Sequence, residues 1–218
     1  ISVLWVFSVL SGCTQPAPPD TGFVIKAGQI AITPVQFSEE LDLKLTGYPY
    51  DVKTNPDEYN AMVLDLVSTL SDEAVLLAAA KERGFVITQA VLDTAEAEFK
   101  KEYPDDSFDQ MLLETAISYP VWKNRLKKDM VIQKLIQQDL IDIQEITPED
   151  MVAFYDQHSA PSADDTASAE TIDEKGLVEQ LRMEKSQAAF DGWIQELKLA
   201  YPVEINKDAV AAFLKTGN

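Results

Sequence analysis

The sequence predicts a mainly helical protein with a small antiparallel β-sheet. Most of the 218-residue chain repeats apolar residues at intervals of three and four, which is the spacing of amphipathic helices. Two short apolar runs near the N-terminus flank a turn that contains glycine, and a run near the C-terminus alternates apolar and polar residues as a half-buried strand does. The composition, with 46% hydrophobic and 25% charged residues, is that of a globular chain.

The first thirteen residues have the order of a bacterial lipoprotein signal. Residues 1–10 are almost wholly apolar, and Ser11 and Gly12 then supply the small residues of a cleavage site. The run is too short for a membrane-spanning helix, which needs about 20 residues. Leu10-Ser11-Gly12-Cys13 resembles the bacterial lipobox, Leu-[Ala/Ser]-[Gly/Ala]-Cys, at all four positions. The resemblance implies that residues 1–12 are removed and that Cys13 carries a diacylglyceryl group on its sulfur and becomes the mature N-terminus.

The alternative interpretation is that Cys13 is an ordinary residue in an apolar N-terminus.

The sequence has no initiator Met and no basic segment before the apolar run, so we expect a few signal-peptide residues to precede Ile1. Thr14 stands where an Asp usually signals inner-membrane retention, which favours an anchor in the outer membrane. Residues 13–22 contain three prolines and are expected to form an extended tether.

The overall charge and the supply of ligand-forming residues exclude several classes of function. The net charge is −19 and the isoelectric point is about 4.3, whereas a nucleic acid partner demands clustered Lys and Arg. With one His and one Cys, the chain has no zinc site, and its acidic pairs lack the spacing of a calcium loop. We therefore predict no metal, no cofactor and no nucleic acid partner.

The N-terminal part of the folded chain predicts a hairpin followed by a helix. Phe23-Val24-Ile25 and Ile30-Ala31-Ile32 flank a turn in which Gly28 can take the positive φ that a tight hairpin needs. Thr33-Pro34-Val35-Gln36 has the pattern of a capping box with proline in the first turn. The helix that it opens carries apolar residues on one face and ends at Gly47-Tyr48-Pro49; these residues are Phe37, Leu41 and Leu45.

Three helices are predicted next. The first runs from Asp57 to Arg83 and stops at Gly84. Thr88 caps the second, which ends at Pro104, and Ser107-Phe108-Asp109-Gln110 is a second capping box that opens the third. The residues expected on their inner faces are Tyr59, Met62, Val63, Leu66, Leu70, Ala74, Leu77 and Ala78 in the first, Val91, Ala95 and Phe99 in the second, and Leu112, Leu113, Ala116 and Ile117 in the third.

Pro120 begins another long helix, which is basic in an otherwise acidic chain. Its inner face is expected to carry Trp122, Leu126, Met130, Gln133 and Ile136. Its basic residues are Lys123, Arg125, Lys127, Lys128 and Lys134. We expect these cations to pair with acidic side chains of neighbouring helices, at about 0 to 1 kcal/mol for each exposed pair.

The last third of the chain predicts a helix, a linker and a closing helix and strand. Thr147-Pro148-Glu149-Asp150 starts a helix with Val152 and Tyr155 on its inner side. Residues 159–169 consist of Ser, Ala, Asp, Thr and one Pro without apolar periodicity, and are expected to form a linker. A helix over 172–200 follows, with inner residues Leu177, Leu181, Ala188, Phe190, Ile194 and Leu197.

The C-terminus is predicted to contain one strand and one short helix. Tyr201-Pro202-Val203-Glu204-Ile205 alternates apolar and polar residues, and the proline favours an edge strand. A short helix is expected over residues 208–214.

This series of elements resembles the chaperone module of the SurA/PrsA family of bacterial envelope proteins. The order and spacing of the matches carry the resemblance, since each match alone is also a good generic helix or turn. Together they cover most of residues 23–158. The matching segments are Val24-Ile25-x-x-Gly28-x-x-x-Ile32-Thr33 with Phe37 after it, Leu76-Leu77-x-x-Ala80-Lys81-x-x-Gly84, Ser107-Phe108, Ile132-Gln133-Lys134-Leu135 within the Trp122 to Leu135 helix, and Ile146-Thr147-Pro148-Glu149-Asp150-x-x-x-Phe154-Tyr155-x-x-His158.

The resemblance also implies how the domains are arranged. In that family a parvulin-type prolyl isomerase domain follows the Tyr-x-x-His helix, but here residues 159–171 are too few and too polar to build a core. The chain resumes with Lys185-x-x-Ala188-x-Phe190-x-x-Trp193-Ile194-x-x-Leu197 and then Val203-Glu204-Ile205. Residues 23–158 and 172–207 are thus expected to form one chaperone domain, whose last strand returns to the N-terminal hairpin, with 208–218 as a C-terminal helix and tail.

The expected function is that of a lipid-anchored periplasmic chaperone, which binds unfolded outer-membrane or secreted chains without ATP and without isomerase activity. The alternative is a structural or assembly subunit that uses the same fold to hold one dedicated partner of an envelope export or surface complex. An enzyme is not predicted, because His158 is the only histidine and forms no plausible triad.

The sequence does not identify the residues that contact a client. Aromatic and Met side chains are the natural candidates, but at helical spacing they are more often part of the core. The candidates are Tyr48, Tyr50, Met62, Met111, Trp122, Met151 and Trp193.

Overall fold

The computed structural model describes residues 22–103, 107–158 and 174–216. The predicted signal segment, Cys13, residues 14–21 of the tether and the 159–171 linker therefore lie outside the described residues. Within these ranges the protein is mainly helical with one small antiparallel sheet, as the sequence predicts. Its elements are β1 (Ile25–Ala27), β2 (Ile30–Ile32), α1 (Pro34–Leu45), the 3₁₀-helix η1 (Tyr50–Thr54), α2 (Pro56–Glu82), α3 (Gln89–Lys101), α4 (Ser107–Glu114), α5 (Tyr119–Ile136), the π-helical turn η2 (Gln137–Ile141), α6 (Pro148–His158), α7 (Glu174–Ala200), β3 (Val203–Ile205) and α8 (Lys207–Ala211).

The sheet joins the two ends of the described chain. Its strand order is β2-β1-β3, and Ile25 of the central strand pairs with Ile32 on one side and with Ile205 on the other. The predicted hairpin, the returning C-terminal strand and its edge position are therefore confirmed. Gly28 turns the hairpin with a φ of +54°, and a Cβ there would stand 3.4 Å from the side chains of both Ala78 and Tyr201. Glycine thus meets a conformational and a steric demand at this turn.

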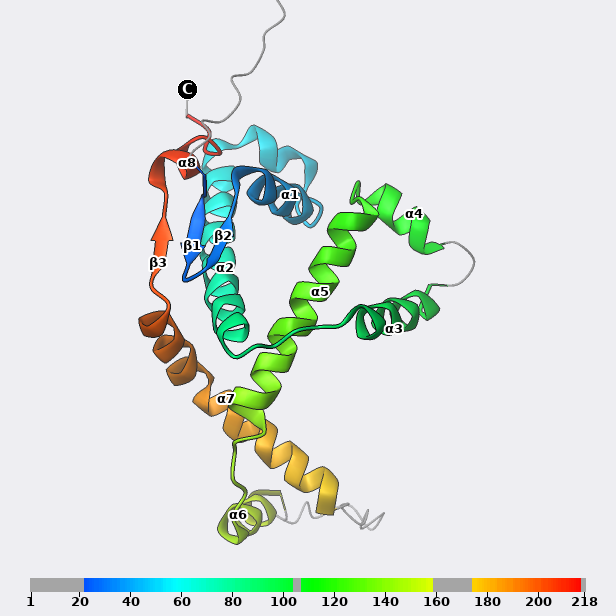
Figure 1. The fold of residues 1–218 in the computed structure, drawn as a ribbon, viewed down its shortest axis with the longest axis vertical. Coiled ribbons are helices and arrows are strands. Elements are labelled where there is room, and N and C mark those ends of the chain that lie inside the picture. Colours follow the sequence, from blue (N-terminus) through cyan, green and yellow to red (C-terminus); the bar gives the residue numbers. More distant parts are fainter. Residues whose placement is uncertain (1–21, 104–106, 159–173, 217–218) are drawn as a thin grey trace, which may run out of the picture.

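The main core lies between the sheet and α2. Figure 1 shows α2 running behind β1 and β2, with α1 beside the sheet and α5 passing obliquely by the lower end of α2. The apolar face of α2 and the inner side chains of β1 and α1 are buried together. The largest side chains with almost no exposed surface are Phe37, Ile25, Leu70, Leu135, Leu177, Val24, Val63 and Val75.

Local capping explains where the first two long helices begin. Thr33 and Gln36 form the predicted capping box of α1 in both directions. Asn55 caps α2 by accepting hydrogen bonds from two backbone N–H groups, those of Asp57 and Glu58, and α2 begins at Pro56. The predicted start at Asp57 is one residue late, and η1 between the two helices was not predicted at all.

Helices α3 and α4 and the first half of α5 project from this body as an arm (residues 89–103 and 107–125; Figure 1). The arm has a small core of aromatic rings, and Phe108 and Trp122 meet edge to face with their centroids 4.8 Å apart. Phe99 contacts both, at 6.1 Å and 5.2 Å. Tyr103 stacks on Phe99 at 5.3 Å, so the arm has a packed interior of its own.

Helix α6 and the first half of α7 form a second projection, the foot (residues 146–158 and 174–184), at the opposite end from α1 (Figure 1). Phe154, Leu177 and Leu181 are buried there and pack with Ile146 and Met151. Thr147 and Asp150 cap α6 reciprocally, because the Asp150 carboxylate accepts from Thr147 N–H while Thr147 Oγ1 accepts from Asp150 N–H. The predicted Thr-Pro helix start is confirmed.

Several predicted inner faces are wrong by one residue or more. Val152 is 59% exposed, and Phe154 is the buried residue of α6; the side chain of Tyr155 is not among those described. Val91 is also exposed, and Leu92 is buried in its place; in α4 the predicted Leu112 is buried, whereas Leu113 is exposed. These are short helices that contact the rest of the protein along a narrow stripe. If such a helix is rotated by one residue position, its inner face is still apolar, so the sequence pattern does not distinguish the two orientations.

Two long helices change partners along their length. The first half of α7 packs on α6, and its second half packs on α2 and η2. The inner face therefore rotates between Leu181 and Ile194, which leaves Ala188 and Phe190 exposed although the sequence placed them inside. On α5, Gln133 is likewise exposed, and Leu135 is fully buried.

The second capping box is also not formed. Gln110 donates to Glu114 instead of reaching back, and Ser107 Oγ is buried without a hydrogen-bond partner among the described residues. Helix α4 ends at Glu114, so Ala116 and Ile117 lie in the turn to α5 and not on the helix.

Candidate functional site

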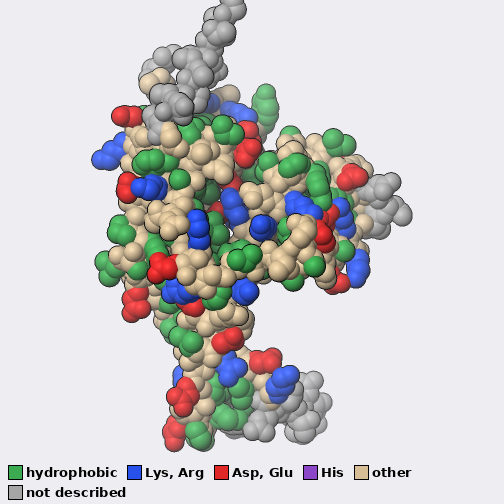
Figure 2. Space-filling model, viewed as in Figure 1, with side chains coloured by type: hydrophobic (Ala, Val, Ile, Leu, Met, Phe, Trp, Pro, Cys, Tyr) green, Lys and Arg blue, Asp and Glu red, His purple; other side chains and the backbone are tan. Residues whose placement is uncertain are grey.

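An open groove of about 870 Å³ lies between the body and the arm. One wall is the C-terminal half of α1 with the loop and 3₁₀-helix that follow it, and the other is the corner between α4 and α5. Figure 2 shows the arm standing apart from the upper body with a notch between them. The lining residues are Glu39, Asp42, Leu43, Leu45, Thr46, Tyr48, Pro49, Tyr50, Val52, Lys53, Glu114, Thr115, Ala116, Ile117, Ser118 and Val121.

The groove offers aromatic and aliphatic surface to solvent. Tyr50 is 94% exposed and Tyr48 is 40% exposed, which are unusual values for large side chains that stand next to one another. Val52 is buried beneath them, and Ile117 and Val121 are half-buried on the opposite wall. The groove can therefore cover apolar side chains of an extended segment without first opening.

A strained turn fixes the arm side of the groove. Ala116 has a φ of +54°, a left-handed conformation that is unfavourable for residues with a Cβ. The N–H of Ile117 donates to Leu112 O at 3.0 Å and the N–H of Ala116 donates to Leu113 O at 3.2 Å, which together form a Schellman-type end to α4. This turn aims residues 115–118 into the groove.

The structure separates the sequence-predicted client-contact candidates into two groups. Tyr48 and Tyr50 line the groove together. Met62 is buried in the main core, Trp193 packs against it, Trp122 belongs to the aromatic interior of the arm and Met151 packs in the foot. Met111 is half-buried on α4 and is not among the groove residues. The core interpretation thus holds for most of the candidates.

Sequence reasoning missed the aliphatic and acidic members of the groove. Leu45 was taken only as a core residue, and nothing marked Val121 or the carboxylates of Glu39 and Asp42. The available signal was Tyr48-Pro49-Tyr50, two aromatic residues around a proline in a segment predicted as a loop. Loops lie on the surface, so aromatic residues there are a functional indication.

The predicted pairing of the basic helix with acidic neighbours is confirmed for Lys123, Arg125 and Lys128, and the last two fasten α5 to the body. Arg125 contacts Glu73 at 2.5 Å and Glu40 at 3.5 Å, and Lys128 contacts the same two carboxylates at 3.1 Å and 2.7 Å. Glu40 lies on α1 and Glu73 on α2, so the cluster joins three helices. Its centre is Glu73, whose side chain is only 5% exposed.

Burial and the neighbouring charges together determine the pKa values in this cluster. Burial alone would lower the pKa of Lys128, but the hydrogen bond to Glu40 and the charges of Glu73 and Glu40 outweigh it and raise that pKa. Asp129, which Arg125 also contacts at 3.2 Å, has a raised pKa because it is partly buried and lies near the other carboxylates. The cations are therefore held firmly charged at the junction.

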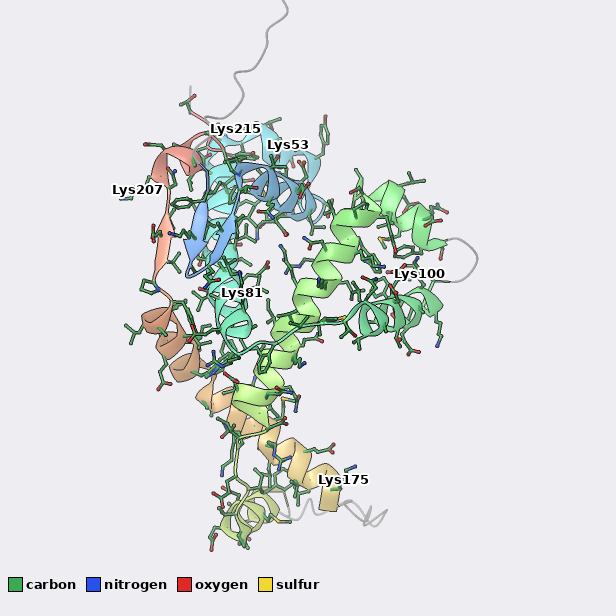
Figure 3. The ribbon with its side chains drawn as sticks, viewed as in Figure 1. Lys53, Lys81, Lys100, Lys175, Lys207 and Lys215 are labelled. Atoms are coloured by element: carbon green, nitrogen blue, oxygen red, sulfur yellow. The ribbon has the colours of Figure 1, made fainter. Side chains whose placement is uncertain are left out.

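A second cluster lies inside the arm around Glu96. Hydrogen bonds from Lys100, Lys123 and Tyr119 lower the pKa of the Glu96 carboxyl to about 2. Lys123 also contacts Asp93 at 3.0 Å, and the pKa of Lys123 is raised by these hydrogen bonds to Glu96 and Asp93. Figure 3 shows Lys100 within the arm, where its ammonium also lies 4.8 Å from the ring centroid of Phe108. The Glu96 cluster ties α3 to α5.

Acidification is expected to remove the contribution of Glu96 to stability. Its folded-state pKa of about 2 lies below the ordinary value of 4.5, so its stabilisation is complete above about pH 4.5 and is lost as the pH falls toward 2. Urea midpoints of the wild type and of Glu96→Gln should therefore differ most at pH 7 and converge between pH 4.5 and pH 3. Glu98→Gln on the same helix removes an exposed pair and should change little at either pH. A Glu96→Gln difference that stays constant down to pH 3 would contradict this account.

The described residues contain no group of three or more His, Cys, Asp or Glu placed to hold a metal ion. None of the helices within those ranges is long and apolar enough to cross a membrane. His158 ends α6, and its side chain is not among those described.

Models of known protein families give no match to this chain, and curated proteins include no significant relative.

Proposed function

We propose that this protein is a lipid-anchored chaperone of the bacterial envelope, which binds unfolded outer-membrane or secreted chains without ATP and without prolyl isomerase activity. The anchor would be Cys13, most naturally in the outer membrane, with residues 13–22 as the tether. The lipobox-like motif and the ordered matches to the SurA/PrsA chaperone module support this proposal from the sequence. The groove between the body and the arm supports it from the structure.

One observation carries the proposal furthest, namely the exposed pair Tyr48 and Tyr50 on an open groove. Single exposed apolar side chains are common on folded proteins, but adjacent aromatic side chains on an open groove are typical of a surface that binds another chain. Covering a large apolar or aromatic side chain contributes about 1.5–3 kcal/mol, which is enough to retain an unfolded segment reversibly when two or three are covered. No bond is made or broken in this mechanism.

The closed sheet and the contacts between helices hold the two walls of the groove in place. Because β3 returns to pair with β1, the body closes on itself, and the predicted linker between α6 and α7 is not needed to complete the sheet. The two groove walls are held by the capping box of α1 and by the Arg125 and Lys128 contacts to Glu40 and Glu73. The groove is thus largely formed before a client arrives.

The test is suppression of aggregation. The full chain, at modest molar excess, should lower the light scattering of a urea-unfolded β-barrel outer-membrane protein after dilution. Tyr48→Ser/Tyr50→Ser should need about tenfold more protein for the same effect, since about 1.4 kcal/mol of binding is a factor of ten. Leu199→Ser is the matched control, because Leu199 is 82% exposed at the end of α7, far from the groove.

Failure to protect several unrelated unfolded proteins would refute the chaperone proposal. Capture of one stoichiometric partner from envelope extracts, in place of many unfolded chains, would favour an assembly subunit that holds one dedicated partner. A prolyl isomerase assay on a model peptide should show only background activity.

A further inference from the structure

The charges around the groove differ from those of the chain as a whole. The chain has 37 Asp and Glu against 18 Lys and Arg, close to two acids for each base. Three carboxylates and one lysine line the groove; they are Glu39, Asp42, Glu114 and Lys53. All four residues are exposed, and Glu114 accepts a hydrogen bond from the uncharged amide of Gln110 at 2.8 Å.

The groove continues into a second hollow of about 470 Å³ on the other side of Tyr48, Pro49 and Val52. These three residues line both depressions and so form a shared apolar ridge. The charged residues of the second hollow are all acidic, and they are Asp51, Glu58 and Asp65. Asp65 is held by Lys44 at 2.6 Å, which leaves two carboxylates on this side without a described ion pair.

Most of the Lys and Arg side chains are in ion pairs or lie away from the groove. All 18 Lys and Arg lie within the described ranges, and at least ten of them are in ion pairs there, including Lys123, Arg125 and Lys128 of the basic helix. Of the lysines labelled in Figure 3, Lys53 and Lys215 stand at the groove end of the body, whereas Lys81, Lys175 and Lys207 lie elsewhere. Lys215 is engaged, because its ammonium donates to Lys53 O and lies 4.3 Å from the Tyr59 ring centroid.

A third hollow, of about 310 Å³ on the foot, has the same chemistry at a distance from the groove. It is lined by Pro148, Val152 and Ala153 with Glu149 and Asp156, and it contains no base. Val152, the residue wrongly predicted to be inside, is its exposed apolar side chain. Apolar surface within an acidic rim thus occurs at three places.

We propose that the groove, together with the hollow beyond its Tyr48, Pro49 and Val52 ridge, selects extended segments in which apolar or aromatic side chains alternate with Lys or Arg. The inference rests on the proposed chaperone function and names its substrate class. Along an extended strand successive side chains point to opposite faces, so apolar residues can cover the ridge while the cations between them reach the rim. Acidic segments are repelled by the same carboxylates.

The size of the preference follows from the exposure of the carboxylates. An exposed ion pair strengthens an interaction up to about fivefold, and several acting together give about tenfold or more. Because these charges are in water, the preference weakens as the Debye length shrinks from about 30 Å at 0.01 M salt to about 8 Å at 0.15 M.

The experiment uses three fluorescent peptides with the same apolar residues and with Lys, Ser or Glu at every intervening position. Fluorescence anisotropy with the full chain at low salt should give about tenfold tighter binding of the Lys peptide than of the Glu peptide, and a smaller ratio at 0.15 M salt. The groove variant Glu39→Gln/Asp42→Asn/Glu114→Gln should reduce the ratio to about threefold or less. Tyr48→Ser/Tyr50→Ser should weaken the binding of all three peptides by similar factors.

The control variant Glu179→Gln/Asp191→Asn/Glu196→Gln removes the same number of charges from exposed positions of α7. It should leave the ratio unchanged, because these residues line none of the three hollows. Equal binding of the three peptides, or an equal fall in the ratio for the control variant, overturns the inference. In either case aggregation suppression by the wild type would leave the chaperone proposal standing, whereas no binding of any peptide together with no suppression refutes both.

Discussion

Replacing Glu73 by alanine is expected to lower the free energy of unfolding by about 3–5 kcal/mol. Glu73 lies near the middle of α2 with a side chain that is 5% exposed, and it contacts Arg125 and Lys128 together. Removing it leaves two cations at the junction of α1, α2 and α5 with only Glu40 and Asp129 as partners. Glu73 is the most buried carboxylate of the cluster, so the loss of both its ion pairs and the cavity left in its place are far more unfavourable than the loss of a surface pair.

Urea unfolding followed by circular dichroism measures this change, and Asp72→Ala supplies the matched control. Asp72 precedes Glu73 on the same helix and contacts Lys198 at 2.7 Å, but both side chains are substantially exposed. Its removal is expected to lower the unfolding free energy by about 0–1 kcal/mol. Equal effects of the two substitutions would show that the cluster is no more than a solvated set of charges.

Glu73 also leaves part of its hydrogen-bonding capacity unused. Its Oε1 is buried and 3.1 Å from Lys128 Nζ, a contact that counts as an ion pair but lacks hydrogen-bond geometry. The cluster therefore holds the arm in place without reaching its strongest possible arrangement. Small displacements of α5 relative to α2 would change which oxygen each cation contacts.

Phe37→Ala is expected to lower the free energy of unfolding by about 3–5 kcal/mol, as large-to-small changes of buried aromatic residues do. Phe37 is completely buried, and its ring centroid lies 4.7 Å from that of Phe213 near the C-terminus. The cavity would loosen α1, whose outer surface supplies Glu39 and Asp42 to the groove, and the segment that contains Phe213.

Thermal or urea unfolding of Phe37→Ala and Val35→Ala separates burial from helix propensity. Val35 is 69% exposed on the same helix, so its replacement is expected to change stability by no more than about 0.5 kcal/mol. A small effect of Phe37→Ala would mean that α1 is not anchored through the core. The groove wall would then need another support.

The parts of the fold that follow from local chemistry could be predicted from the sequence. Thr33 and Gln36 form the capping box that their spacing predicts, and Gly28 takes the positive φ that its turn requires. Most of the predicted apolar face of α2 is buried, because a helix of 27 residues repeats its apolar spacing often enough to define that face. The alternation in Val203-Glu204-Ile205 correctly predicts a strand, and Pro202 before it correctly predicts the edge position.

The remaining features, namely the helix faces and the groove, depend on which surfaces pack together. Local sequence patterns do not show that packing. The faces of α3 and α6 were misassigned by one or two residues, with Leu92 and Phe154 buried in place of Val91 and Val152. The groove arises between α1 and the α4–α5 corner, which are about 70 residues apart in the sequence. Of the groove residues, the sequence indicates only Tyr48 and Tyr50 as client-contact candidates, because aromatic side chains are recognisable without knowing what lies opposite them.

The strand order also determines when the protein can finish folding. The arm forms from contacts within residues 89–125, which are close in sequence and therefore quick to make. The central strand β1, by contrast, pairs Ile25 with Ile205, and so the sheet stays incomplete until residues 203–205 reach it. During that interval the apolar side chains of β1 and α2 are only partly covered, and the folding chain has the same exposed character as the unfolded chains that it is proposed to bind.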